Sequence, residues 1–378
     1  MSVLIQNKLL NKGWKRFSIM HAEDRVASIR EDGTCTIYRV FLMPYDLYLE
    51  NADESDFEMR FNNLNYFYHW CASRVLTLDR KYAKEIFNSI GAKQAVTDRD
   101  RAVISISYHS LSLTDVYWVK QDRENVSFKD INLFNNSLSN AFADVSICGN
   151  SLTVQNAELI KNEDAAGDIS TSGVAPKAWI RENGNIYLLK NGEQRDVEAE
   201  LLASKIVQCF RVDSIKYTQD TFDNKKVSRS EIVTSIDKGI VPIESIDIYC
   251  ANNNINRDEF VLSKDAYSFF MMNIVDYLVG NIDRHWGNWG FYVDNRTNKL
   301  AKLYPLMDFN KSFLSYDTIE GAKCLTNSKN QTQLEAAVEA VKNVGLNQVK
   351  DVQENWFSDS DTSKMFFARL SILKNVIR

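Results

Sequence analysis

The stretch Gly280–Phe291 reads GNIDRHWGNWGF, and Asp308 follows it in the segment LYPLMDF. Asp283, Asn288 and Asp308 come in an order that phosphoryl transfer can use. A first carboxylate can orient and deprotonate an attacking hydroxyl, and an amide oxygen and a later carboxylate can hold magnesium against nucleotide phosphates. The spacing alone is a weak signal, because Asp and Asn also cap ordinary surface turns.

The segments around this stretch strengthen the phosphoryl-transfer interpretation. The apolar run Tyr267–Val279 predicts a buried helix before it. Two strand-like runs, Trp289–Val293 and Leu300–Leu306, follow it and are separated by turn formers. Helix, polar loop, hairpin and aspartate is the order in which protein kinases build a metal site, with the same D-x-x-x-x-N spacing in the loop. We therefore predict Asp283 as the catalytic base and keep the capped surface turn as the alternative.

Composition and charge bound the class of protein. The chain has 378 residues, of which 44% are hydrophobic and 25% charged, and this is normal for a globular protein with a sizeable core. The net charge of −5 argues against a general nucleic-acid-binding surface, so we expect no direct nucleic-acid binding. Six scattered cysteines without a C-x-x-C pair predict buried, reduced thiols rather than a zinc site.

No targeting or membrane segment stands out. The N-terminus, MSVLIQNKLLNKGWKRF, has too short an apolar stretch for a signal peptide. No run reaches the roughly 18 apolar residues that a membrane helix needs. We therefore expect a cytoplasmic protein with no membrane partner, and secretion by a route without a signal peptide stays open.

The N-terminal part of the chain alternates strand-like and helical segments. Cys35–Met43 and Ala102–Tyr108 read as strands, and Phe61–Val75 reads as a helix. The polar stretch Asn156–Thr171 predicts a linker, and a helical C-terminal part begins near Ser263. The predicted domains are an N-terminal subdomain of open role, a mostly β N-lobe and a helical C-lobe, at residues 1–155, 156–255 and 256–378.

A second set of residues is suited to nucleotide phosphates. The segment Ser170–Lys177, STSGVAPK, reads as a turn whose backbone N–H groups can meet phosphate oxygens, with an ordinary polar hairpin turn as the alternative. Lys190 ends the strand-like run IYLLK and can reach α- and β-phosphates. The predicted helix Val197–Phe210 begins just after it, and an ion pair from this helix would hold Lys190 extended.

Two glutamates compete for that ion pair. We favour Glu200 over Glu198 as the partner of Lys190. The alternative for both is a solvated first turn, where acidic residues suit the helix dipole.

Three segments together resemble the HipA-like serine/threonine kinases. STSGVAPK resembles their S-x-S-G-V-Q-P-K loop, NIDRHWGN resembles their N-x-D-x-H-x-x-N loop, and LYPLMDF resembles their L-x-P-L-Y-D segment. The resemblance implies a two-lobed kinase-like α+β fold with an additional N-terminal α/β subdomain. It also implies a bacterial enzyme that transfers phosphate from ATP, with Mg²⁺, to Ser or Thr of a protein substrate. An antitoxin or regulator as a further partner is left open.

The resemblance also assigns roles residue by residue. Asp283 would be the catalytic base, with His285 supporting its loop, and Asn288 and Asp308 would bind magnesium. Lys190 would bind ATP. The remaining nucleotide-binding residues would be Ser170, Thr171, Ser172, Gly173, Val174, Lys177 and Glu200. Ser170 and Ser172 match the positions at which several members phosphorylate themselves, which ejects the loop and inactivates the enzyme.

The sequence departs from the family at some positions, and two alternatives stay open. Ala175 stands where the family usually has glutamine, and the N-terminal region differs from that of the longest HipA toxins. D-R-H-x-x-N is also the catalytic loop of phosphatidylinositol kinases, although no membrane-docking segment is evident. The third hypothesis is a catalytically silent interaction module with a kinase shape.

Overall fold

The computed structural model describes residues 15–89, 97–122, 124–136, 138, 146–147, 175–314 and 316–376. The described residues form two compact units. Unit 1 takes those within Met1–Ile186, Thr234–Gly239 and Asp294–Lys299, and unit 2 takes those within Tyr187–Val233, Ile240–Val293 and Leu300–Arg378. The predicted domain boundaries near residues 155 and 255 remain predictions. The structure combines helices with antiparallel strand pairs, so the predicted α+β class is confirmed.

Unit 1 is built on a four-stranded sheet with the order β3-β2-β1-β4. Its antiparallel strands are β1 (Arg16–His21), β2 (Asp24–Arg30), β3 (Cys35–Ile37) and β4 (Tyr117–Gln121). The helices α2 (Phe57–Ser73) and α4 (Asp98–Ser107) pack against each other, and α2 contributes Phe67 and Trp70 to the core beneath the sheet. The shorter elements are η1 (Val40–Leu42), α3 (Ala83–Ser89), α5 (Phe128–Ile131) and β5 (Lys177–Glu182).

Two expectations for this unit were wrong in part or in whole. Ala102–Tyr108 was predicted as a strand, but it lies in α4, which begins with a capping box formed by Thr97 and Asp100. The cap satisfies orphan backbone donors, and burial of Ile104 and Ile106 outweighs their strand propensity. The strand predicted for Cys35–Met43 ends at Ile37 and gives way to η1. The helix predicted around Phe61–Val75 is confirmed as α2.

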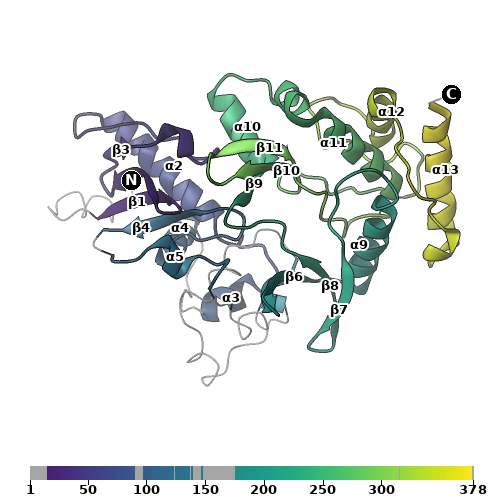
Figure 1. The fold of residues 1–378 in the computed structure, drawn as a ribbon, viewed down its shortest axis with the longest axis horizontal. Helices are drawn as coiled ribbons and strands as arrows, with labels where there is room; N and C mark the ends of the chain where they lie inside the picture. Colours follow the sequence, from purple (N-terminus) through teal and green to yellow (C-terminus); the bar gives the residue numbers. More distant parts are fainter. Residues whose placement is uncertain are drawn as a thin grey trace. The chain divides into compact units, whose positions relative to one another are not determined.

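Unit 2 contains an antiparallel sheet with a helix packed on it. The strands β6 (Asn185–Asn191), β8 (Lys225–Glu231) and β7 (Thr218–Phe222) are neighbours in that order, and β6 enters the unit at Tyr187. The helix α9 (Gln194–Val207) packs against β7 and β8 (Figure 1). Lys190 lies opposite Ser228 in the β6–β8 register, so their side chains share one face.

The rest of unit 2 is largely helical. The long helix α11 (Arg257–Val279) packs against α10 (Ile243–Asn252), α12 (Gln333–Val344), α13 (Ser360–Val376) and α9 (Figure 1). A small sheet has the order β11-β10-β9, with β9 (Lys238–Pro242), β10 (Gly290–Asp294) and β11 (Lys299–Leu303), and a short turn η3 (Glu354–Trp356) precedes α13. The predicted buried helix Tyr267–Val279 is the C-terminal part of α11.

The end of α11 sets the start of the polar loop that follows. Gly280 ends the helix in the left-handed conformation, with φ 59°, and its N–H donates to the last turn. A Cβ at this position would lie 2.5 Å from the ring of Tyr316, so both the backbone and the space require glycine. Residues 281–289 therefore leave the helix in a fixed direction.

Two further observations concern the cysteines and the helices of the described residues. The described cysteines, Cys35, Cys71, Cys209, Cys250 and Cys324, are buried free thiols, as expected. Within the described ranges, no helix is both long and apolar enough to cross a bilayer.

Candidate functional site

An arginine and an aspartate that sequence reasoning overlooked shape the loop after α11. Arg284 is 2% exposed and forms two hydrogen bonds to the carboxylate of Asp276 on α11, at 2.8 and 2.9 Å. It also donates to the carbonyl oxygens of Asn288 (3.1 Å) and Met307. One buried guanidinium thus ties the loop to the helix before it and to the segment before Asp308, in a geometry that only Arg can satisfy.

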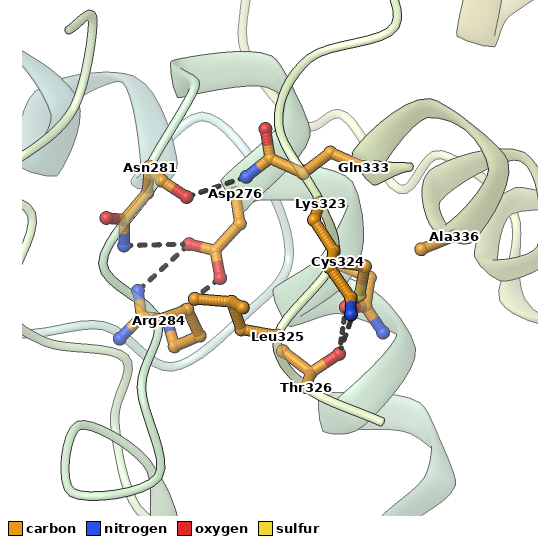
Figure 2. A pocket seen from close by; sticks show the side chains of 10 residues that line it. Asp276, Asn281, Arg284, Lys323, Cys324, Leu325, Thr326, Gln333 and Ala336 are labelled. Atoms are coloured by element: carbon orange, nitrogen blue, oxygen red, sulfur yellow. Dashed lines mark hydrogen bonds and ion pairs between the residues drawn. The ribbon is translucent and has the colours of Figure 1, made fainter. Parts of the chain in front are cut away.

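A polar network continues this support behind the loop (Figure 2). Asn281 donates to Asp276 at 3.2 Å, and Gln333 of α12 donates to the backbone oxygen of Asn281 at 2.6 Å. The Oδ1 atom of Asn281 accepts the N–H of Asp283 at 3.1 Å. These bonds satisfy buried polar groups and fix the backbone from which the Asp283 side chain projects.

Asp283 lies half-buried within this supported loop. Burial raises the pKa of its carboxyl above the usual value, nearby His285 and Lys311 lower it, and Asp308 raises it further. Asn281, which accepts the N–H of Asp283, also lies with its Nδ2 3.5 Å from the backbone oxygen of Asp308, so both residues adjoin one side chain. Asn288 donates its Nδ2 to the carbonyl of Asp283 at 2.9 Å, which leaves its Oδ1 as the atom that can ligate a metal.

Lys190 is the centre of a buried charge cluster. Its Nζ lies 2.7 Å from a carboxylate oxygen of Glu200 and 2.7 Å from Oδ1 of Asp308. The side chains of Lys190 and Glu200 are 8% and 1% exposed, and that of Asp308 is 19% exposed. Burial alone would lower the pKa of Lys190, but Asp308 and Glu200 raise it well above its usual value, so the amine stays charged.

Two residues without an obvious sequence signal complete this cluster. The hydroxyl of Ser228 donates to the second oxygen of Glu200, and the hydroxyl of Tyr217 accepts the backbone N–H of Asp308 at 3.2 Å. Tyr217 is half-buried, and desolvation raises the pKa of its phenol. Glu198, by contrast, is exposed and accepts from Gln194. Glu200, not Glu198, is therefore the glutamate that pairs with Lys190.

Asp308 has an unusual backbone. Its φ is 59°, in the left-handed region that non-glycine residues seldom enter. Asp tolerates this conformation better than most residues, although it still costs stability. Strained backbones of this kind concentrate at functional sites.

The segment after Asp308 is tied to α9. Lys311 forms an ion pair with Asp196 at 2.7 Å, and Arg195 donates to the carbonyl oxygen of Phe313 at 3.0 Å. His285 is exposed, and its Nδ1 accepts the N–H of Gly287 at 3.1 Å, so it shapes the tip of the loop. The supporting role that the resemblance implied for His285 remains a prediction.

The phosphate-loop predictions are only partly covered by the structure. Ser170, Thr171, Ser172, Gly173 and Val174 lie outside the described residues. Lys177 belongs to unit 1, where it is buried and its carbonyl accepts a hydrogen bond from Arg80. The roles of these residues in nucleotide binding remain predictions.

No protein-family model matches the sequence, and no curated protein matches it. Among solved structures, the chain is similar to HipA of Shewanella oneidensis MR-1, solved in a toxin–antitoxin complex with HipB and its operator DNA. The TM-score is 0.54 at 10% sequence identity, over 95% of this chain and 99% of that one.

A second solved structure is similar to part of this chain. The Helicobacter pylori proinflammatory kinase CtkA matches with a TM-score of 0.39 and 15% identity, over 53% of this chain and 90% of that one. The similarity to HipA covers nearly all of both chains, and it is a similarity of fold. The chain thus has an α+β fold similar to that of HipA.

Proposed function

We propose that this protein is a HipA-like serine/threonine protein kinase that transfers the γ-phosphate of ATP to a protein hydroxyl. One observation carries the proposal: Lys190 contacts both Glu200 and Asp308 at 2.7 Å inside unit 2. A lysine–glutamate ion pair beside a metal-binding aspartate is the arrangement that protein kinases require for activity. These three residues come from a strand, a helix and a distant loop, so their meeting is not a consequence of sequence proximity.

The residues present fit a magnesium–nucleotide complex. ATP with Mg²⁺ would supply the phosphoryl group and neutralise its charge. Mg²⁺ is usually bound through one or two carboxylates and takes its other ligands from phosphates and water. Asn288 and Asp308 offer an amide oxygen and a carboxylate of this kind, and the described residues contain no richer cluster of acidic, His or Cys ligands. Lys190 would bind phosphate oxygens.

Asp283 is suited to orient the attacking hydroxyl and accept its proton. The raised pKa makes its carboxylate a better base than that of an ordinary aspartate. The bonds from Asn281 and Asn288 to its backbone hold it in position. Orientation of this kind accounts for a large share of catalysis in phosphoryl transfer.

Two finer parts of the proposal concern regulation and partners. Phosphate on Ser170 or Ser172 would add about 1.5–2 negative charges to the loop and repel nucleotide phosphates. Autophosphorylation there would therefore inactivate the enzyme. A protein substrate is required, and an antitoxin or regulator is a further candidate partner.

The test is phosphate transfer from labelled ATP with Mg²⁺. We expect wild-type protein to label itself or a protein substrate, and Asp283→Asn and Asp308→Asn to lose about 10²-fold or more in rate. Glu198→Gln serves as the matched control for Glu200→Gln, because Glu198 is exposed on the same helix. Equal labelling by wild type and Asp283→Asn would refute the assignment. Label in added phosphoinositide rather than in protein would favour the lipid-kinase alternative.

A further inference from the structure

A cavity that opens to solvent lies beside the loop between Asp283 and Asn288. Its volume is about 370 Å³, and Glu244, His285, Trp286, Gly287 and Leu325 line it. This is within the size range of sites that bind small ligands or single side chains. Three of the lining residues lie between Asp283 and Asn288 in the sequence, so the cavity is formed partly by the loop that carries these two residues.

Trp286 forms a rigid platform in this cavity. Its indole N–H donates to the carbonyl oxygen of Leu325 at 3.3 Å, and the guanidinium of Arg257 lies 4.5 Å from its ring centre. Arg257 is itself held by Asp258 at 2.8 Å and by Asp247 at 3.5 Å. The indole is nevertheless 39% exposed, and Leu325 beside it is 38% exposed. A fixed aromatic surface binds a side chain with little loss of conformational entropy.

The charges around the cavity favour a cationic ligand. Glu244 is exposed in the first turn of α10, and its backbone N–H donates to the carbonyl of Trp286 at 3.2 Å. Within the described ranges, the carboxylate of Glu244 forms no ion pair. The positive charge of Arg257 is already countered by Asp247 and Asp258. The carboxylate of Glu244 therefore adds an uncompensated negative charge to an apolar wall.

On the basis of the proposed function, we infer that this cavity binds substrate side chains next to the phosphorylated Ser or Thr. An apolar side chain would pack on Trp286 and Leu325, and a Lys or Arg would pair with Glu244. Trp286 is three residues from Asp283, and three residues of chain span at most roughly 11 Å. The two recognised side chains would thus lie within about three residues of the phosphoacceptor.

The inference is tested with Ser- and Thr-centred peptide libraries, ATP and Mg²⁺, on the full-length protein. We expect wild type to prefer a basic and an apolar residue near the phosphoacceptor. Glu244→Gln should lower kcat/KM for the basic peptide roughly two- to fivefold, and Glu244→Lys should shift the preference toward acidic peptides. Trp286→Ala should raise KM roughly tenfold with kcat little changed, and Trp286→Phe should recover most of that loss.

Matched controls and opposing outcomes separate the inference from the proposed function. Glu259→Gln and Leu262→Ala alter an exposed acid and a similarly exposed leucine on α11, and both should keep wild-type selectivity. If Trp286→Ala does not fold, Leu325→Ala and Glu244→Lys decide the question. Phosphorylation with unchanged selectivity in the Trp286, Leu325 and Glu244 variants would overturn the inference and leave the kinase function standing. Absence of any transfer by wild type would overturn both.

Discussion

Lys190→Met is the sharpest test of the buried charge cluster. The substitution keeps an unbranched side chain of similar length and removes the amine that holds Glu200 and Asp308. Among the described residues, Glu200, which is 1% exposed, then keeps only the hydroxyl of Ser228 as a hydrogen-bond partner. Removing one member of a buried ion pair costs about 3–5 kcal/mol. Because Asp308 is 19% exposed and partly solvated, we expect the lower end, about 3 kcal/mol.

Glu200→Gln should cost less, about 1–3 kcal/mol, because Lys190 keeps Asp308 and a neutral amide oxygen can still accept its hydrogen bond. In the double variant no buried glutamate carboxylate is left uncompensated. The double variant should therefore lose about 1–3 kcal/mol less stability than the sum of the two single losses.

Burial lowers the pKa of Lys190, but its carboxylate partners raise it well above 10.5. Its stabilising effect is thus fully present below about pH 10.5, and is lost only as pH rises through the higher folded-state pKa.

The assay is urea-induced unfolding near neutral pH, followed by tryptophan fluorescence and by circular dichroism. Coincidence of the two curves establishes that one transition is compared among the variants. The exposed pair Lys302–Asp213, with both side chains 59% exposed, is the control and should couple by less than about 1 kcal/mol. Strictly additive losses for Lys190→Met and Glu200→Gln would refute the buried cluster.

Other variants address the loop and the base. Arg284→Lys cannot form both hydrogen bonds to the Asp276 carboxylate, so phosphate transfer should fall at least tenfold while ATP affinity, measured by calorimetry, stays within a few-fold. Unchanged transfer would contradict the positioning role of Arg284. Lys311→Met removes a charge that lowers the pKa of Asp283, so the acidic limb of the kcat–pH profile should move to higher pH, and a move to lower pH would show that the sign is wrong. Gly280→Ala should lower the unfolding free energy by more than about 1 kcal/mol, measured by urea, since both its positive φ and its lack of space oppose a side chain.

The sequence was sufficient for elements whose local pattern agrees with their environment. The apolar run before Gly280, the loop with Asp283 and the hairpin after it all have the predicted order. The prediction from sequence failed at Ala102–Tyr108, where the alternation of apolar and polar residues suggested a strand. A helix forms there instead, because Thr97 and Asp100 cap its start and α4 packs on α2.

The supporting residues of the site were harder to predict. Asp276 is an acid inside an apolar run, eight positions before Arg284, and this was a usable signal for a buried ion pair. Ser228 and Tyr217 carry no comparable signal, because a serine in an alternating strand and a tyrosine in a loop have many ordinary roles. Their contacts with Glu200 and Asp308 arise only when distant segments meet.

The left-handed backbone at Asp308 also limits how this protein could change over evolution. Asn and Gly accept that conformation readily, whereas β-branched residues are strongly disfavoured there. A descendant that lost the acid while remaining folded would most easily pass through Asn or Gly. Relatives carrying either residue at this position would therefore be natural candidates for non-catalytic scaffolds derived from the same ancestor.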